Sequence, residues 1–202
     1  MADRTSVSNM ALLHLGATEE IQNVNTENSE AAIACRRAFT PALELFQREF
    51  SWPFSNVIQA LALVEESPNT EWAFSYQYPS DCKMFHRILS GTRNDSRQSR
   101  VPYRIARGES GSVIFTDKED AFGDWSVVET DLNRYPPDAI MTLSFLIAHL
   151  ISPKITSGDP FKLGARAFAL YNQARNSAQA NALNEQQDDE PTQSEFIAGR
   201  DS

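Results

Sequence analysis

Residues 28–64 read NSEAAIACRRAFTPALELFQREFSWPFSNVIQALALV, and the spacing of their apolar side chains changes partway along. Up to Phe50 the apolar residues recur at the three- and four-residue spacing of one helix face. This predicts a helix that begins near Asn28 or Ser29, where a side-chain oxygen can cap free backbone amides. Pro41 lies inside this helix and is expected to kink or split it, because proline removes a backbone hydrogen bond.

After Trp52 the spacing becomes that of strands. Residues 57–64 form one alternating run, and residues 72–78 alternate strictly between aromatic and other side chains, as in a half-buried strand. Glycines separate several further short candidates, where turns are needed. These candidates are residues 84–89, 103–106, 112–115 and 125–128. The middle of the chain is therefore predicted to be a small, mostly antiparallel sheet.

Helical spacing returns on both sides of this middle. Residues 5–15 predict a short helix. Another is expected from Asp138 to about residue 151, ended by Pro153, and because it is apolar all round it should lie at the centre of the core. The last helix is predicted over 160–183. Its narrow face of small residues should pack closely against a neighbour in the same chain or in another copy.

The chain is therefore predicted to be an α+β protein with three parts. Residues 1–51 and 131–184 form a helical bundle, residues 52–130 form an inserted β-rich domain, and residues 185–202 form an extended C-terminal tail. The tail holds six acidic side chains against one arginine, and Phe196-Ile197 is its apolar pair. Alone it should be disordered, because it has almost nothing to bury.

Composition narrows the class of protein. The 202 residues carry a formal net charge of -9, which makes the chain a poor candidate for gripping nucleic-acid phosphates. Cys35 and Cys82 cannot supply a four-ligand zinc site, and Cys35 is expected to be a small core residue. The N-terminus lacks a signal-peptide pattern, and the apolar run 139–151 is shorter than the roughly 20 residues of a membrane span. We expect a soluble protein made in a cytoplasm, without a membrane partner.

The sequence contains no recognised catalytic, metal-binding or cofactor motif. No histidine lies three or four residues from another histidine or from paired carboxylates, and His149 is expected to be a hydrogen-bonded core residue. The acidic residues of 117–124 could hold Ca²⁺, but they lack EF-hand spacing, so a solvated acidic loop is the better interpretation. We predict a protein that is not an enzyme and has no catalytic residue, metal or cofactor.

Basic residues gather in one part of the β-rich middle. Between positions 83 and 107 only Asp95 opposes seven lysines and arginines. Two interpretations stay open: an exposed hairpin with solvated arginines, or a surface for an acidic partner such as nucleic acid or an acidic protein. The residues of this basic insert are Arg93, Arg97, Arg100, Arg104 and Arg107.

Several short motifs follow one another in a familiar order. They are NMALLHLG at 9–16, ENSEAAIAC at 27–35, FSWPF at 50–54 and YQYPSDC at 76–82. Together with Ala169, Tyr171 and Ala174 near the end, they resemble the tailed-phage head-to-tail adaptors of the tail tubular protein A family. The resemblance covers nearly the whole chain and is weakest between Arg93 and Arg107.

The resemblance implies a structural role in the virion. It implies a dodecameric ring of identical subunits between the portal and the tail tube or nozzle, assembled in the host cytoplasm, with DNA passing through the ring unread. The helical bundle would pack around the ring, the β domain would project from it, and the C-terminal segment would dock onto the portal. The candidate interface residues are Phe168, Tyr171, Arg175, Phe196, Ile197 and Arg200.

Two other functions stay open from the sequence. One is a virion-associated hydrolase of glycans or peptidoglycan, using carboxylates that the sequence does not single out. The other is a nucleic-acid-binding regulator that uses the basic insert. Activity lost on one Asp or Glu change would favour the first. Salt-dependent DNA binding that is lost on Arg97→Ala with Arg100→Ala would favour the second.

Overall fold

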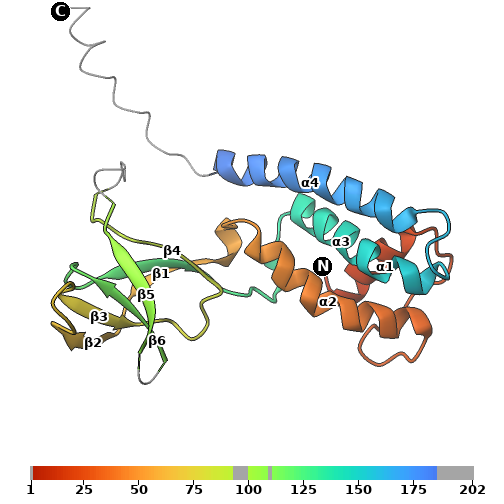
Figure 1. The fold of residues 1–202 in the computed structure, drawn as a ribbon. Helices are drawn as coiled ribbons and strands as arrows, with labels where there is room; N and C mark the ends of the chain where they lie inside the picture. The colour runs from red at the N-terminus through yellow and green to blue at the C-terminus, as the bar shows by residue number, and fades with distance from the viewer. Residues whose placement is uncertain (1, 93–99, 109–110, 186–202) are drawn as a thin grey trace, which may run out of the picture.

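Helices from the two ends of the chain pack into one bundle, and the strands form a region beside it (Figure 1). The computed structural model describes residues 2–92, 100–108 and 111–185. The helices are α1 (Arg4–His14), α2 (Glu30–Arg48), α3 (Pro137–Ile155) and α4 (Leu163–Glu185). α3 packs against the other three helices, so the predicted central helix is confirmed. The predicted α+β architecture is confirmed as well.

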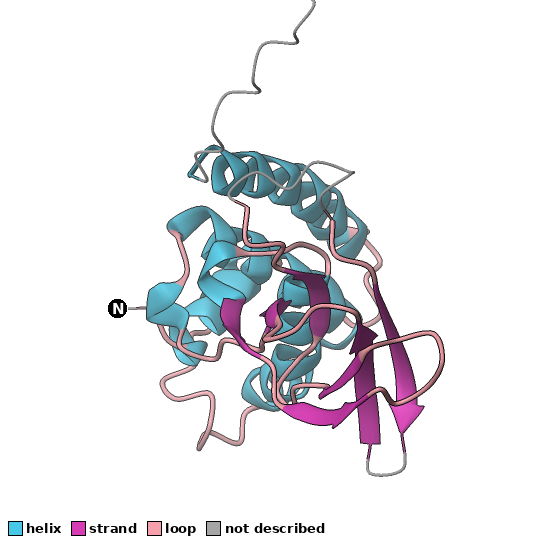
Figure 2. Ribbon diagram, turned by 90° about the vertical axis from the view of Figure 1, so that its left-hand side faces the viewer, coloured by secondary structure: helices cyan, strands magenta, loops and turns pink. Residues whose placement is uncertain are grey.

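The strands form two antiparallel sheets rather than the single sheet that the sequence predicts. The first sheet has the order β1 (Asn56–Ala60), β7 (Phe122–Ser126), β4 (Met84–Ile88). The second has the order β2 (Leu63–Glu66), β3 (Phe74–Gln77), β6 (Gly111–Thr116), β5 (Tyr103–Gly108). Seen from the strand end, both sheets lie in front of the helices (Figure 2).

The alternating run 57–64 is two strands in two sheets, which corrects the prediction of one strand. β1 ends at Ala60, and the Leu61 side chain is buried in the core of the β region. There the Leu61 amide donates to the Ala121 carbonyl at 2.8 Å, and the Leu61 side chain lies against Gly123. These contacts of Leu61 are with residues about 60 positions further along the chain, so local alternation does not reveal the break between the two strands.

Both prolines inside helices lie in unbroken helices, so α2 is not split at Pro41 and α3 does not end at Pro153 as predicted. α2 continues through Pro41, and α3 continues past Pro153 to Ile155. Buried side chains on both sides of Pro41, including Phe39 and Phe46, hold α2 against the bundle. Tertiary packing of an apolar face supplies most of the stability of a helix in a protein, so it outweighs one missing hydrogen bond.

In the four-stranded sheet, residues that pair from strand to strand form rows across the sheet. One row consists of Leu63, Tyr76, Ile114 and Ile105. The next row consists of Glu65, Ser75, Phe115 and Arg104. The register shifts within β2 between Leu63 and Glu65, so Val64 forms a bulge there. Each row therefore begins on β2 and ends on β5.

α4 packs on α3 through small side chains of the same chain. Gly164, Ala167 and Ala178 are buried at this contact, and a Cβ added to Gly164 would lie 1.9 Å from Ser152 Oγ. The helix begins at Leu163 rather than at residue 160. The turn before it has a positive φ of 54° at Lys162, and the Asp159 carboxylate accepts a hydrogen bond from the Gly164 amide at 3.0 Å.

Candidate interaction surfaces

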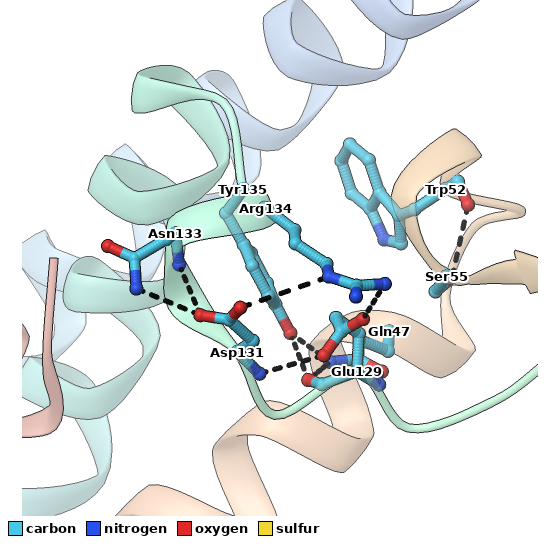
Figure 3. Close-up of polar contacts among 8 residues, drawn as sticks. All are labelled: Gln47, Trp52, Ser55, Glu129, Asp131, Asn133, Arg134 and Tyr135. Carbon is cyan, nitrogen blue, oxygen red and sulfur yellow. Dashed lines mark hydrogen bonds and ion pairs between the residues drawn. The ribbon is translucent and has the colours of Figure 1, made fainter.

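A polar cluster fastens the bundle to the β region (Figure 3). The Gln47 side chain, on α2, donates to the Glu129 carbonyl at 2.8 Å and accepts from the Glu129 amide at 3.0 Å. It also donates to the Tyr135 hydroxyl, which in turn donates to the Glu129 carbonyl at 2.7 Å. Gln47 and Tyr135 are buried, so these bonds are shielded from water. The chain that leaves β7 is thereby held against α2.

Aromatic rings fill the same junction. The Trp52 ring stacks on Phe46 with a centroid distance of 4.7 Å, and Phe54 packs on Tyr135 at 4.2 Å. The Trp52 indole donates to the Phe46 carbonyl at 3.1 Å. The motif FSWPF therefore sits at the passage from helix to sheet, as predicted. The residues of 129–135 that contact this motif were not predicted, because no local sequence pattern marks them.

The described chain ends beside this junction. A hollow of about 330 Å³ is lined by Trp52 and Tyr135 and also by Asn181, Ala182 and Glu185 from the end of α4. Figure 1 shows the end of α4 reaching toward the strands. The segment that follows Glu185 therefore starts where the bundle meets the β region.

The predicted interface residues of α4 have different surroundings. Phe168 is 42% exposed and packs beside His149. Tyr171 is 1% exposed, and its hydroxyl donates to the Glu49 carboxylate, which also binds the Arg175 guanidinium at 3.0 Å. Burial and the nearby carboxylate raise the pKa of Tyr171. Tyr171 and Arg175 thus tie α4 to the end of α2 within one chain, and Phe168 is left as the surface residue of the three.

A groove of about 720 Å³ runs between α2 and α3. Its floor is largely apolar and includes Ile33, Pro41 and Ile151. Charged residues stand at its rim, where Lys154 pairs with Glu30. Such a groove is a surface suited to another helix or a peptide.

Acidic side chains from other parts of the chain form ion pairs with basic residues in and near the basic insert. The Arg87 guanidinium lies 3.1 Å from the Asp124 carboxylate, and Lys83 lies 3.6 Å from Glu44. Arg104 lies 4.0 Å from Glu71. These partners weaken the positive field that a phosphate-binding surface needs. Arg93 and Arg97 lie outside the described residues, and Arg100 is exposed.

The histidines act as hydrogen-bond donors in the fold. Ser126 Oγ donates to Asn56 Oδ1 at 2.8 Å, so the 2.7 Å contact from His86 Nε2 to Ser126 Oγ needs a proton on His86. His86 therefore cannot serve as a base toward Ser126, which is itself buried. His149 Nδ1 donates to the Gly164 carbonyl at 3.0 Å, so its predicted hydrogen bond is confirmed, but the side chain is half-buried rather than in the core.

The described residues also bear on the predictions about metal binding, the acidic loop, Cys35 and the apolar helix α3. Within them, no three His, Cys, Asp or Glu side chains gather in a way that could hold a metal ion. Asp124 lies in β7 rather than with the loop acids that precede it. Cys35 is buried in the bundle core, as predicted, and burial raises its pKa to about 11. By length and composition α3 could cross a membrane, yet 56% of that stretch is buried in the bundle, as in a core helix.

Neither a model of a known protein family nor a curated protein matches this chain. Three candidate interface residues, Phe196, Ile197 and Arg200, lie outside the described residues.

Proposed function

We propose that this chain is a structural subunit of a phage head-to-tail connector. In this proposal twelve copies form a ring adaptor between the portal and the tail, and DNA passes through the ring. The ring number, the portal and the tail tube or nozzle come from the motif resemblance. Catalysis has no part in the proposal.

The observation that carries the proposal is the bundle built from both ends of the chain, with a β region inserted between them. This is the architecture that the resemblance implies. The buried junction around Gln47 and Trp52 holds the two parts against each other. A subunit whose parts keep a fixed orientation can present two different surfaces to its neighbours at once, as a ring adaptor must.

Exposed apolar side chains on both parts support an assembly role. In the helical part they include Leu45, Leu150, Phe161, Phe168 and Leu183. In the β part they include Ile58, Leu63, Val64, Met84, Ile105 and Phe122. Apolar surface of this kind commonly becomes buried in contacts with other proteins.

The acidic character of the chain also supports passage of DNA rather than capture. With a net charge of -9 per subunit, a ring of copies would offer phosphates little net attraction. The ion pairs of Arg87 and Lys83 further reduce the positive field near the basic insert. We therefore expect no tight, salt-dependent DNA binding by the assembled ring.

Removal of the C-terminal tail tests its proposed role in docking onto the portal. We expect a chain ending at Glu185 to unfold at the same temperature as the full chain, because the four helices and their buried contacts lie before that residue. Its co-sedimentation with the portal protein of the same phage should fall at least about tenfold, since the tail is the proposed docking arm. Normal docking of the shortened chain would contradict the role given to the tail.

A further inference from the structure

The four-stranded sheet has two edge strands, β2 and β5, that pair with no further strand among the described residues. All four residues of β2 are exposed, and so are Arg104, Ile105 and Arg107 on β5. An edge strand presents backbone N–H and C=O groups that can pair with a further strand. We infer that β5 of one copy pairs with β2 of the next copy, so that the sheet continues from subunit to subunit. The inference rests on the proposed function, because it requires that copies of the chain associate with one another.

One row of apolar residues extends across the sheet to both edge strands. Its central members are buried, and its end members are exposed. Its central members, Tyr76 and Ile114, are 2% and 0% exposed. Its end members, Leu63 on β2 and Ile105 on β5, are 50% and 44% exposed. If a second copy adds its β5 beside β2 in the same register, its Ile105 lies beside Leu63. The row then continues into the second copy, and both exposed ends become buried, which favours the contact.

The neighbouring row supplies opposite charges in the same register. It begins at Glu65 on β2 and ends at Arg104 on β5. The strands of the sheet are all antiparallel to their neighbours, so an added β5 also runs antiparallel to β2. Arg104 of the added copy then faces Glu65. Within one chain Arg104 lies 4.0 Å from Glu71 and both side chains are well exposed, so this weak pair is easily exchanged.

The charges on the two edges select this pairing over the alternatives. Two β2 strands side by side would bring Glu65 and Glu66 against their own copies, and two β5 strands would do the same with Arg104 and Arg107. Charged edges ordinarily prevent pairing between copies, but opposite edges of opposite charge attract. A contact between two different surfaces is head-to-tail, which closes into a ring when the rotation per copy fits a full turn.

Charge reversal tests the contact directly. Glu65→Lys with Glu66→Lys makes both edges basic, and Arg104→Glu with Arg107→Glu makes both edges acidic. Each variant alone should self-associate at least about tenfold more weakly than the wild type in sedimentation, because every edge contact then joins like charges. A 1:1 mixture of the two variants should recover wild-type assembly, because each basic edge then meets an acidic edge. Glu19→Lys with Glu20→Lys raises the net charge by as much as Glu65→Lys with Glu66→Lys, at an exposed place elsewhere, and should have no effect.

A cross-link tests the register. In a Cys82→Ser background, Leu63→Cys with Ile105→Cys should give a ladder of disulfide-linked multimers on mild oxidation, since the two residues become neighbours in one row. Leu63→Cys with Arg107→Cys uses the same face of β5 two residues away and should cross-link much less. Equal cross-linking of both pairs would overturn the proposed register.

The outcomes separate this inference from the connector proposal. Rings that persist in both charge-reversed variants overturn the edge contact and leave the connector standing. Assembly that depends on the edges but grows into open filaments supports the edge contact and counts against the connector. A wild-type chain that stays monomeric up to about 1 mM overturns the edge contact, and ring formation on the portal would then still support the connector.

Discussion

At Gly164, α4 comes so close to α3 that an added Cβ would lie 1.9 Å from Ser152 Oγ. Alanine is normally better than glycine inside a helix by about 1 kcal/mol. Gly164→Ala should nevertheless lower the free energy of unfolding by about 1–3 kcal/mol, because the new methyl group forces the helices apart. Urea denaturation measures this change. As a control, Ala169→Gly on the exposed side of α4 should lose only about 1 kcal/mol, and a stabilised Gly164→Ala would disprove the close contact.

Gln47 gives a second residue-scale prediction, because its amide satisfies both backbone groups of Glu129. Gln47→Leu keeps a side chain of similar length but leaves the Glu129 amide without this partner. We expect the free energy of unfolding to fall by about 1–3 kcal/mol, the usual effect of a buried polar group left unpaired. Gln173→Leu, on the exposed side of α4, should change it by less than about 0.5 kcal/mol. Equal effects of the two substitutions would show that the junction is not held by this cluster.

At the scale of elements, α4 is tied to the end of α2 through one carboxylate. Glu49 accepts from the Tyr171 hydroxyl and pairs with Arg175. Tyr171→Phe keeps the ring packing and removes the hydroxyl, so we expect faster amide hydrogen exchange along the second half of α4. Tyr78→Phe in the β region should leave exchange in α4 unchanged. Unaltered exchange in Tyr171→Phe would mean that the small-residue face alone holds α4.

Local patterns predict most elements of this fold, and distant contacts explain the rest. The four helices follow from the spacing of apolar residues, and the strict alternation of 72–78 predicts β3. The break between β1 and β2 at Leu61 and the unbroken helix at Pro41 depend on side chains far away in sequence, which no local pattern contains. The same limit applies to the candidate surfaces. Helical spacing marks Phe168 and Tyr171 alike, and only the fold shows that Tyr171 faces Glu49.

At the scale of the whole molecule, the junction holds together two parts that present different surfaces. The helical part carries the α2–α3 groove, and the β part carries the two edge strands of the four-stranded sheet. Because the junction orients these parts, contacts made by one part constrain where the other part points. A ring of such subunits would have one helical layer and one β layer, joined by the aromatic cluster at Trp52 in each subunit.

Negative-stain electron microscopy of the purified chain, alone and mixed with the portal protein that the proposal makes its partner, tests the central claim most directly. The account predicts closed rings with a central channel, either free or stacked on one end of the portal. Class averages should show the rotational symmetry of about twelve copies that the motif resemblance implies. A chain that remains monomeric in both samples and never joins the portal would contradict the account.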